Sequence, residues 1–92
     1  MGPMDAPLDS RRKRILYRAT HRGTKEADFV VGGFFTETAA RLPDAKLDEA
    51  DALLEELDAD LMDWLMGRLP VPDAWKGTLF DDLLAHYRAL KK

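Results

Sequence analysis

The chain has 92 residues, of which 46% are hydrophobic, and its formal net charge is −3. This length and composition predict one domain with a single small core. Because cysteine is absent and only two histidines occur, the sequence excludes a disulfide framework and a thiolate metal site and disfavours an imidazole zinc site. No apolar run approaches the roughly 20 residues that span a bilayer, so we expect no membrane insertion.

The charged residues are separated along the chain. Residues 11–25 carry seven basic side chains and no acidic one, whereas residues 26–66 carry twelve acidic side chains and two basic ones. The pattern predicts an electropositive end and an electronegative middle. The basic segment is either a solvated helix face or a surface that binds nucleic acid or an acidic protein.

The first predicted element is a helix that follows a flexible N-terminal arm. We assign residues 1–8 to the arm and residues 9–92 to a helical domain. Asp9 or Ser10 is a suitable N-cap for a first helix that ends near Thr20. Its apolar side is formed by Ile15, Leu16, Ala19 and Tyr17.

A turn around Gly23 then separates the basic segment from the acidic one. Gly23 either ends the first helix as its C′ residue or caps the second helix. If Gly23 is the N-cap, Glu26 falls at N3, where its carboxylate reaches free backbone N–H groups, and Asp28 adds a second anion to the first turn. We expect Arg22, just before the turn, to project into solvent.

The second helix is predicted from Lys25 to about Leu42. Gly32 and Gly33 interrupt it and should each weaken it by roughly 1 kcal/mol relative to alanine. Their most plausible use is to let a neighbouring backbone approach closely, either within the fold or from a partner. A short strand at residues 29–31 is disfavoured because no second strand is available to pair with it. The apolar positions with helical spacing are Ala27, Val30, Val31, Phe34, Phe35, Thr38 and Leu42.

Two further helices follow a break at Pro43, which suits the first turn of a helix. The first carries an acidic outer face. Residues 58–60 should cap a short fourth helix, residues 61–66, which Gly67 closes. Trp64 is expected to anchor the core. The narrow apolar stripe of the third helix consists of Leu47, Ala50, Leu53, Leu54 and Leu57.

The C-terminal part contains a proline-rich linker and a last helix. Residues 73–76 form a single turn, and Thr78 with Asp81 resembles a capping box for the last helix. Five helices with short connections and no strand predict an all-α fold, a compact five-helix bundle in a single small domain.

The sequence assembles no recognisable catalytic site. It offers no nucleophile with a base, no metal cage and no phosphate-binding loop, and Gly32-Gly33 follows no strand and lacks the spacing of a dinucleotide fingerprint. The carboxylates lie on polar helix faces, where burial does not raise their pKa for acid catalysis. The sequence therefore favours a binding module over an enzyme.

Two sequence blocks together resemble a known family. The first is Arg14-Ile15-Leu16-Tyr17-Arg18 followed by Arg22-Gly23-x-x-Glu26, and the second is Leu53-Leu54-Glu55 followed by Asp58-x-Asp60-Leu61-x-x-Trp64-Leu65. In this order and about 30 residues apart, they resemble the small assembly factors that promote covalent attachment of FAD to the flavoprotein subunit of succinate dehydrogenase and fumarate reductase. The resemblance covers about residues 11–90. His21 and Thr24 depart from the family pattern, in which an arginine and a methionine are common.

The resemblance implies a five-helix flavinylation factor that binds the flavoprotein subunit transiently, is a monomer when free, and holds no FAD stably by itself, because the partner carries the FAD. The basic helix would face an acidic part of that partner. With the compact start of the chain, a bacterial cytoplasm is expected in preference to a mitochondrial matrix. The implied partner-binding residues are Arg18, Arg22, Gly23, Glu26, Asp28 and Gly32.

Two other hypotheses belong to different classes. A small helical nucleic-acid-binding or regulatory adaptor would use residues 11–22 as a phosphate-facing surface, although the acidic remainder of the chain argues against it. An enzyme with an unrecognised site would need a deep pocket lined by perturbed side chains.

Overall fold

The computed structural model describes residues 8–91 and contains five α-helices. The predicted N-terminal arm lies outside the described residues except for Leu8. The helices are α1 (Ser10–Thr20), α2 (Lys25–Thr38), α3 (Asp44–Leu54), α4 (Asp58–Leu65) and α5 (Leu79–Leu90). A single 3₁₀ turn, η1 (Ala39–Arg41), follows α2, and a second, η2 (Asp73–Trp75), precedes α5.

Two of the five helices, α1 and α5, begin at the predicted capping residues. Asp9 caps α1, where its carboxylate accepts a hydrogen bond from the backbone N–H of Arg12 at 2.8 Å. Thr78 caps α5, but Asp81 accepts from the backbone N–H of Gly77 at 3.0 Å, so the predicted reciprocal capping box is not formed. Pro43 is the N-cap of α3 and thus stands one residue before the first helical turn in which we expected it.

Three predicted boundaries were wrong by three or four residues. Helix α2 ends at Thr38, because the chain tightens into η1 before Leu42. Helix α3 ends at Leu54, so Leu57 leaves the expected apolar stripe, becomes the N-cap of α4 and is 69% exposed. Helix α4 therefore begins at Asp58, three residues earlier than predicted.

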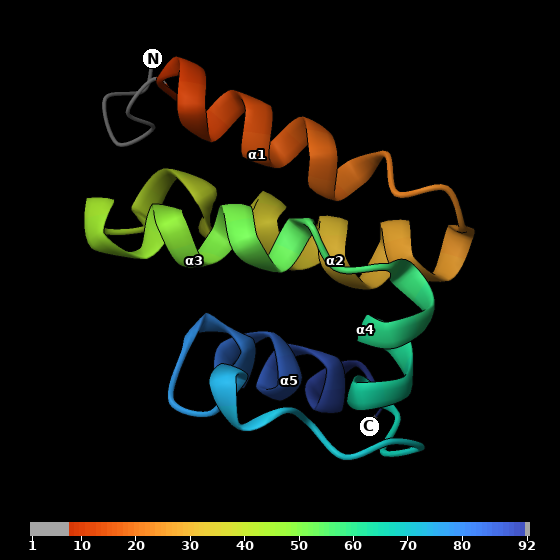
Figure 1. The fold of residues 1–92 in the computed structure, drawn as a ribbon. Coiled ribbons are helices and arrows are strands. Elements are labelled where there is room, and N and C mark those ends of the chain that lie inside the picture. The colour runs from red at the N-terminus through yellow and green to blue at the C-terminus, as the bar shows by residue number, and fades with distance from the viewer. Residues whose placement is uncertain (1–7, 92) are drawn as a thin grey trace.

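Helix α2 runs through the middle of the molecule and contacts helices on both sides (Figure 1). Helix α1 packs along α2 and α3, while α5 lies on the opposite side of this pair and α4 crosses one end of the stack. The predicted five-helix, all-α fold is confirmed. The largest fully buried side chains come from all five helices and are Ile15, Val31, Phe35, Leu53, Leu61, Leu79, Phe80 and Leu83.

Trp64 lies at the edge of this core. Its ring meets the ring of Phe80 edge-on, with centroids 6.2 Å apart, and the side chain is partly buried. In residues 8–91 the structure contains no helix long and apolar enough to cross a membrane.

Candidate protein-binding site

The turn between α1 and α2 is built around a glycine and a threonine cap. Gly23 has a φ of +116°, a conformation that side chains with a Cβ rarely adopt. Thr24 is the N-cap of α2, and its hydroxyl accepts a hydrogen bond from the backbone N–H of Ala27 at 3.2 Å. Both predicted capping positions for Gly23 were wrong, because His21 caps the end of α1 and the side chain that caps α2 belongs to the next residue.

Asp28 closes the same turn from the first part of α2. One of its carboxylate oxygens accepts hydrogen bonds from the backbone N–H groups of Arg22 and Gly23, the latter at 3.3 Å. The Asp28 carboxylate is therefore in the first turn of helix α2, as predicted. It binds backbone N–H groups of the turn that connects α1 to α2. This arrangement fixes the path of the chain into α2.

Arg22 points into the molecule, so the expectation that it projects into solvent was wrong. Its side chain is only 8% exposed, and its Nε donates to the carboxylate of Asp58 at 2.7 Å. Its two Nη groups donate to the carbonyl oxygens of Leu54 at 2.8 Å and Glu56 at 2.6 Å. The last carbonyls of a helix have no helical partner and carry partial negative charge, which attracts the planar guanidinium fork.

The contacts of Arg22 connect two parts of the chain that lie more than thirty residues apart in sequence. They tie the α1–α2 turn to the end of α3 and the start of α4. Arg22 thus acts as a structural clamp between two turns, and Asp58 is its counter-ion.

Glu26 points the other way. It is exposed and forms no hydrogen bond or ion pair with any residue of the described chain, and so it forms none with Arg22. Phe29, three residues further along α2 and therefore on the same side of the helix, is 66% exposed. Together with Gly23 and Thr24, these side chains form an exposed corner of the molecule, which we call the Glu26 corner.

A hollow lies beside this corner. It has a volume of about 260 Å³ and is lined from the start of α2 and from α4 and the residues after it. Met62 supplies an apolar wall and is otherwise buried within the core. The lining residues are Thr24, Glu26, Asp58, Ala59, Met62 and Arg68. Since Asp58 is engaged by Arg22, the carboxylate in the hollow that has no described cation partner is that of Glu26.

Gly32 has a role inside the fold. A Cβ at this position would lie 3.2 Å from the carbonyl oxygen of Ala19 and 3.1 Å from Cγ2 of Thr20, which is closer than side chains ordinarily approach. The close neighbour is therefore α1, one of the two alternatives that the sequence left open. Because α1 covers Gly32, the side on which a partner's backbone would have to lie is already occupied.

The basic helix faces the acidic helix of its own chain. Arg18, 30% exposed, pairs with Glu55 at 2.6 Å and with Asp51 at 3.7 Å. Arg11 binds Asp51 at 2.8 Å and also Asp48. These carboxylates raise the pKa of Arg11 through hydrogen bonds to its side chain, so the pairing favours its charged form.

Arg12, next to Arg11 in the first turn of α1, is used in a similar way. It donates to the carbonyl of Ala39 at 3.0 Å and to that of Leu42, and it pairs with Asp9 at 2.6 Å and with Asp44 at 3.1 Å. Acids of the same chain therefore pair with Arg11, Arg12 and Arg18, and the expectation that this helix faces an acidic part of a partner stays a prediction. The nucleic-acid hypothesis is weakened, because four of the six basic side chains in residues 11–22, Arg22 included, are paired within the chain, while Lys13 and Arg14 stay exposed.

Three exposed apolar side chains were not recognised as surface features from the sequence. Tyr17, expected on the apolar side of α1, is 63% exposed and stacks on His21 with ring centroids 3.9 Å apart. Leu57 became exposed because α3 ends early. Phe29 could have been found, because it lies off the helical face that Ala27, Val30, Val31, Phe34 and Phe35 bury.

These features define a class of protein: a small helical protein with an exposed carboxylate and an exposed aromatic ring at one corner, beside a hollow. Among the described residues, no group of three or more potential metal ligands lies together.

The chain belongs to the Sdh5 family, described as "Flavinator of succinate dehydrogenase", whose profile matches residues 13–87. The resemblance inferred from the two sequence blocks is thereby confirmed.

The relatives include a protein named as an FAD assembly factor and several named as mitochondrial assembly factors. The "FAD assembly factor SdhE" of Acetobacter pasteurianus is 42% identical over 72 residues, which cover 78% of this chain and 66% of that protein. The "Succinate dehydrogenase assembly factor 2, mitochondrial" of Mycosarcoma maydis is 37% identical over 104 residues, covering 96% of this chain and 44% of the relative. The protein of the same name from Saccharomyces cerevisiae is 36% identical, with 75% and 44% covered. The matched regions thus span between under half and about two thirds of these relatives.

Proposed function

We propose that this protein binds the flavoprotein subunit of succinate dehydrogenase and promotes the covalent attachment of FAD to it, with the flavoprotein of fumarate reductase as a second candidate client. Membership of the Sdh5 family and the names of the relatives support this proposal. In this proposal the partner carries the FAD, and the bond forms between that FAD and a histidine of the partner. The chain itself acts as a binding module and supplies no catalytic group.

The observation that carries the proposed binding mode is the contrast between Glu26 and Arg22. Glu26 is exposed and lines a hollow, whereas the guanidinium of Arg22 is bound by residues of its own chain. We assign to Glu26 a charge-assisted hydrogen bond with a donor of the partner, flanked by the exposed Phe29 and the backbone of Gly23. Arg22 and Asp28 become positioning residues that hold this corner in shape, and Gly32 and Arg18 are left out of the contact.

A rigid corner can promote a reaction that it does not itself perform. If binding holds a mobile part of the flavoprotein in one orientation, the flavin and the acceptor histidine spend more time in the geometry in which they react. The factor must then leave, so the interface should be modest in area and transient.

The test is co-expression of a succinate dehydrogenase flavoprotein subunit with the wild-type factor or with its variants. Covalent flavin is measured as in-gel fluorescence, normalised to the amount of flavoprotein. Glu26→Gln should lower the initial rate of covalent flavin incorporation about tenfold, since one charge-assisted contact is lost. Glu37→Gln, at an exposed acid of the same helix outside the hollow, is the matched control and should behave as wild type. Equal flavin incorporation with all three proteins, or none with the wild type, contradicts the proposal.

Two finer expectations remain predictions. A monomeric free protein should elute from size exclusion at the volume of a single 10.4 kDa chain. The bacterial cytoplasm stays the expected compartment, although the relatives include both a bacterial protein and proteins named as mitochondrial, so fractionation of the source cells is required.

A further inference from the structure

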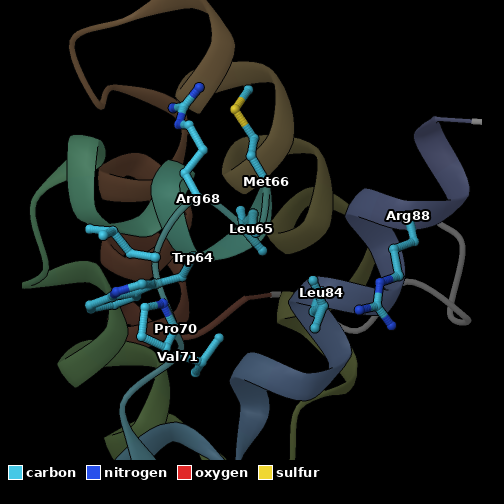
Figure 2. Close-up of a pocket in the computed structure, with 10 residues that line it drawn as sticks. Trp64, Leu65, Met66, Arg68, Pro70, Val71, Leu84 and Arg88 are labelled. Atoms are coloured by element: carbon cyan, nitrogen blue, oxygen red, sulfur yellow. The ribbon is translucent and has the colours of Figure 1, made fainter.

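A second hollow, larger than the one beside Glu26, is lined by residues of the C-terminal part of the chain. This groove has a volume of about 560 Å³ and lies between the end of α4, the linker that follows it, and α5. Figure 2 shows Trp64, Pro70 and Val71 on one side of the groove and Leu84 with Arg88 on the other. Its remaining lining residues are Leu65, Met66, Gly67, Arg68 and Leu69.

The groove combines several apolar side chains with positive charge. Leu65 is buried, and Trp64, Val71 and Leu84 pack against the core while still lining the groove, whereas Leu69 is 49% exposed. The two charged residues in the lining are Arg68 and Arg88, and no acidic residue lines the groove. The groove is thus locally cationic, although the chain as a whole has a net charge of −3.

The two arginines differ in how far they are already satisfied. Arg88 forms no ion pair with any residue of the described part of the chain. Arg68 gives its Nε to Asp63 at 2.8 Å, and its side chain is still 60% exposed, which leaves its Nη groups accessible. Both guanidinium groups can therefore receive a carboxylate from another molecule.

The groove and the hollow beside Glu26 share one lining residue, Arg68. A partner that fills the hollow therefore lies next to a side chain of the groove. The hollow contains the Glu26 carboxylate, whereas the groove contains the Arg88 guanidinium and no acidic residue. Such an arrangement accepts a partner in one orientation and disfavours the reversed one.

We propose that the groove receives a segment of the same flavoprotein subunit that carries an apolar side chain next to a carboxylate. The apolar side chain would lie against Trp64, Val71 and Leu84, and the carboxylate would pair with Arg88. This inference rests on the proposed function, and it makes the groove the second half of the interface that begins at Glu26.

The test is the Kd of the full-length factor for the purified flavoprotein subunit. Arg88→Glu should raise the Kd about fivefold or more, because a favourable exposed pair is replaced by repulsion. Leu69→Ser should raise it about threefold through lost apolar contact. The matched control is Arg41→Glu, a charge reversal in η1 at an exposed arginine that lines neither hollow, and it should leave the Kd within about twofold of wild type.

Thermal unfolding of each variant serves as the folding control, and all are expected to be folded because the substituted side chains are exposed. If Arg88→Glu and Leu69→Ser bind as wild type while Glu26→Gln is weakened, the groove proposal is overturned and the proposed function stands. If Arg41→Glu weakens binding as much as Arg88→Glu, the effect is one of general charge, and the groove proposal is likewise overturned. If the wild type does not bind the flavoprotein, the proposed function itself fails.

Discussion

The α1–α2 turn and the first turns of α2 are adjacent in sequence and opposite in use. In the turn, Arg22 is 8% exposed and makes three bonds to the α3–α4 region. In the helix, Glu26 and Phe29 are exposed, and Glu26 has no described partner. The difference shows that two charged residues of one short motif can have different roles. The cation, Arg22, stabilises the fold, and the anion, Glu26, remains free to contact another molecule.

The largest expected effect is on stability, at the largely buried Arg22. Arg22→Met should lower the free energy of unfolding by about 3 kcal/mol, because it removes a largely buried cation and leaves Asp58 and two carbonyls without their donor. Urea denaturation measures this change. Arg14→Met, at an exposed arginine of α1, should change the same quantity by less than about 0.5 kcal/mol. Equal stability of the two variants would mean that Arg22 is no clamp.

Substitution of the exposed Phe29 should weaken binding to the flavoprotein without changing stability. Phe29→Ser should raise the Kd for the flavoprotein about tenfold, as expected for an aromatic ring at the centre of an interface. Its free energy of unfolding should stay within about 0.5 kcal/mol of wild type, since the ring is exposed. Leu90→Ser, at a partly exposed apolar residue of α5 that lines neither hollow, serves as the binding control and should leave the Kd unchanged. A stability loss with unchanged binding in Phe29→Ser would reverse the assignment.

The two neighbouring glycines of α2 sharpen the same contrast. Gly32→Ala should lower the free energy of unfolding by about 1 kcal/mol, because its Cβ would press on the backbone of α1 and this overpacking outweighs the better helix propensity. Gly33→Ala should raise it by about 0.5 kcal/mol, because the nearest atom, Nε2 of His86, is 3.5 Å away and the propensity gain prevails. Thermal or urea unfolding decides, and effects of the same sign would show that packing against α1 is not the reason for Gly32.

The smallest expected effect is a pH dependence at the start of α1. The backbone N–H of Arg12, together with its guanidinium, holds the pKa of Asp9 below its usual value. A lowered folded-state pKa stabilises the fold above the ordinary pKa of about 4, and this contribution disappears as the pH falls through the lowered value. The stability difference between wild type and Asp9→Asn should therefore be largest near neutral pH and shrink below about pH 4. A difference that grows on acidification would contradict the role of this cap.

Much of the fold follows from local patterns in the sequence. Asp9 and Thr78 are capping residues at the predicted helix starts, and the apolar spacing of α2 locates its buried face. Local patterns failed where a distant segment decides the outcome. The direction of the Arg22 side chain depends on the carbonyl groups of Leu54 and Glu56, which lie 32 and 34 residues further along the chain. The residue spacing within the motif contains no information about these carbonyls.

The pairing of α1 with α3 is an intermediate case. The sequence showed a basic block and an acidic block, and opposite charges within one chain can attract each other. Treating the basic block as a surface for another molecule overlooked this possibility for Arg11 and Arg18. The family resemblance needed no such knowledge, because it depends on residue order alone.

The division between Arg22 and Glu26 is tested most directly by the Kd of Arg22→Met and of Glu26→Gln for the flavoprotein, measured at a temperature at which circular dichroism shows both variants folded. We expect Glu26→Gln to weaken binding about tenfold and folded Arg22→Met to weaken it several-fold less, since only one of the two side chains meets the partner. Wild-type affinity in Glu26→Gln, together with a larger loss in folded Arg22→Met, would contradict this division.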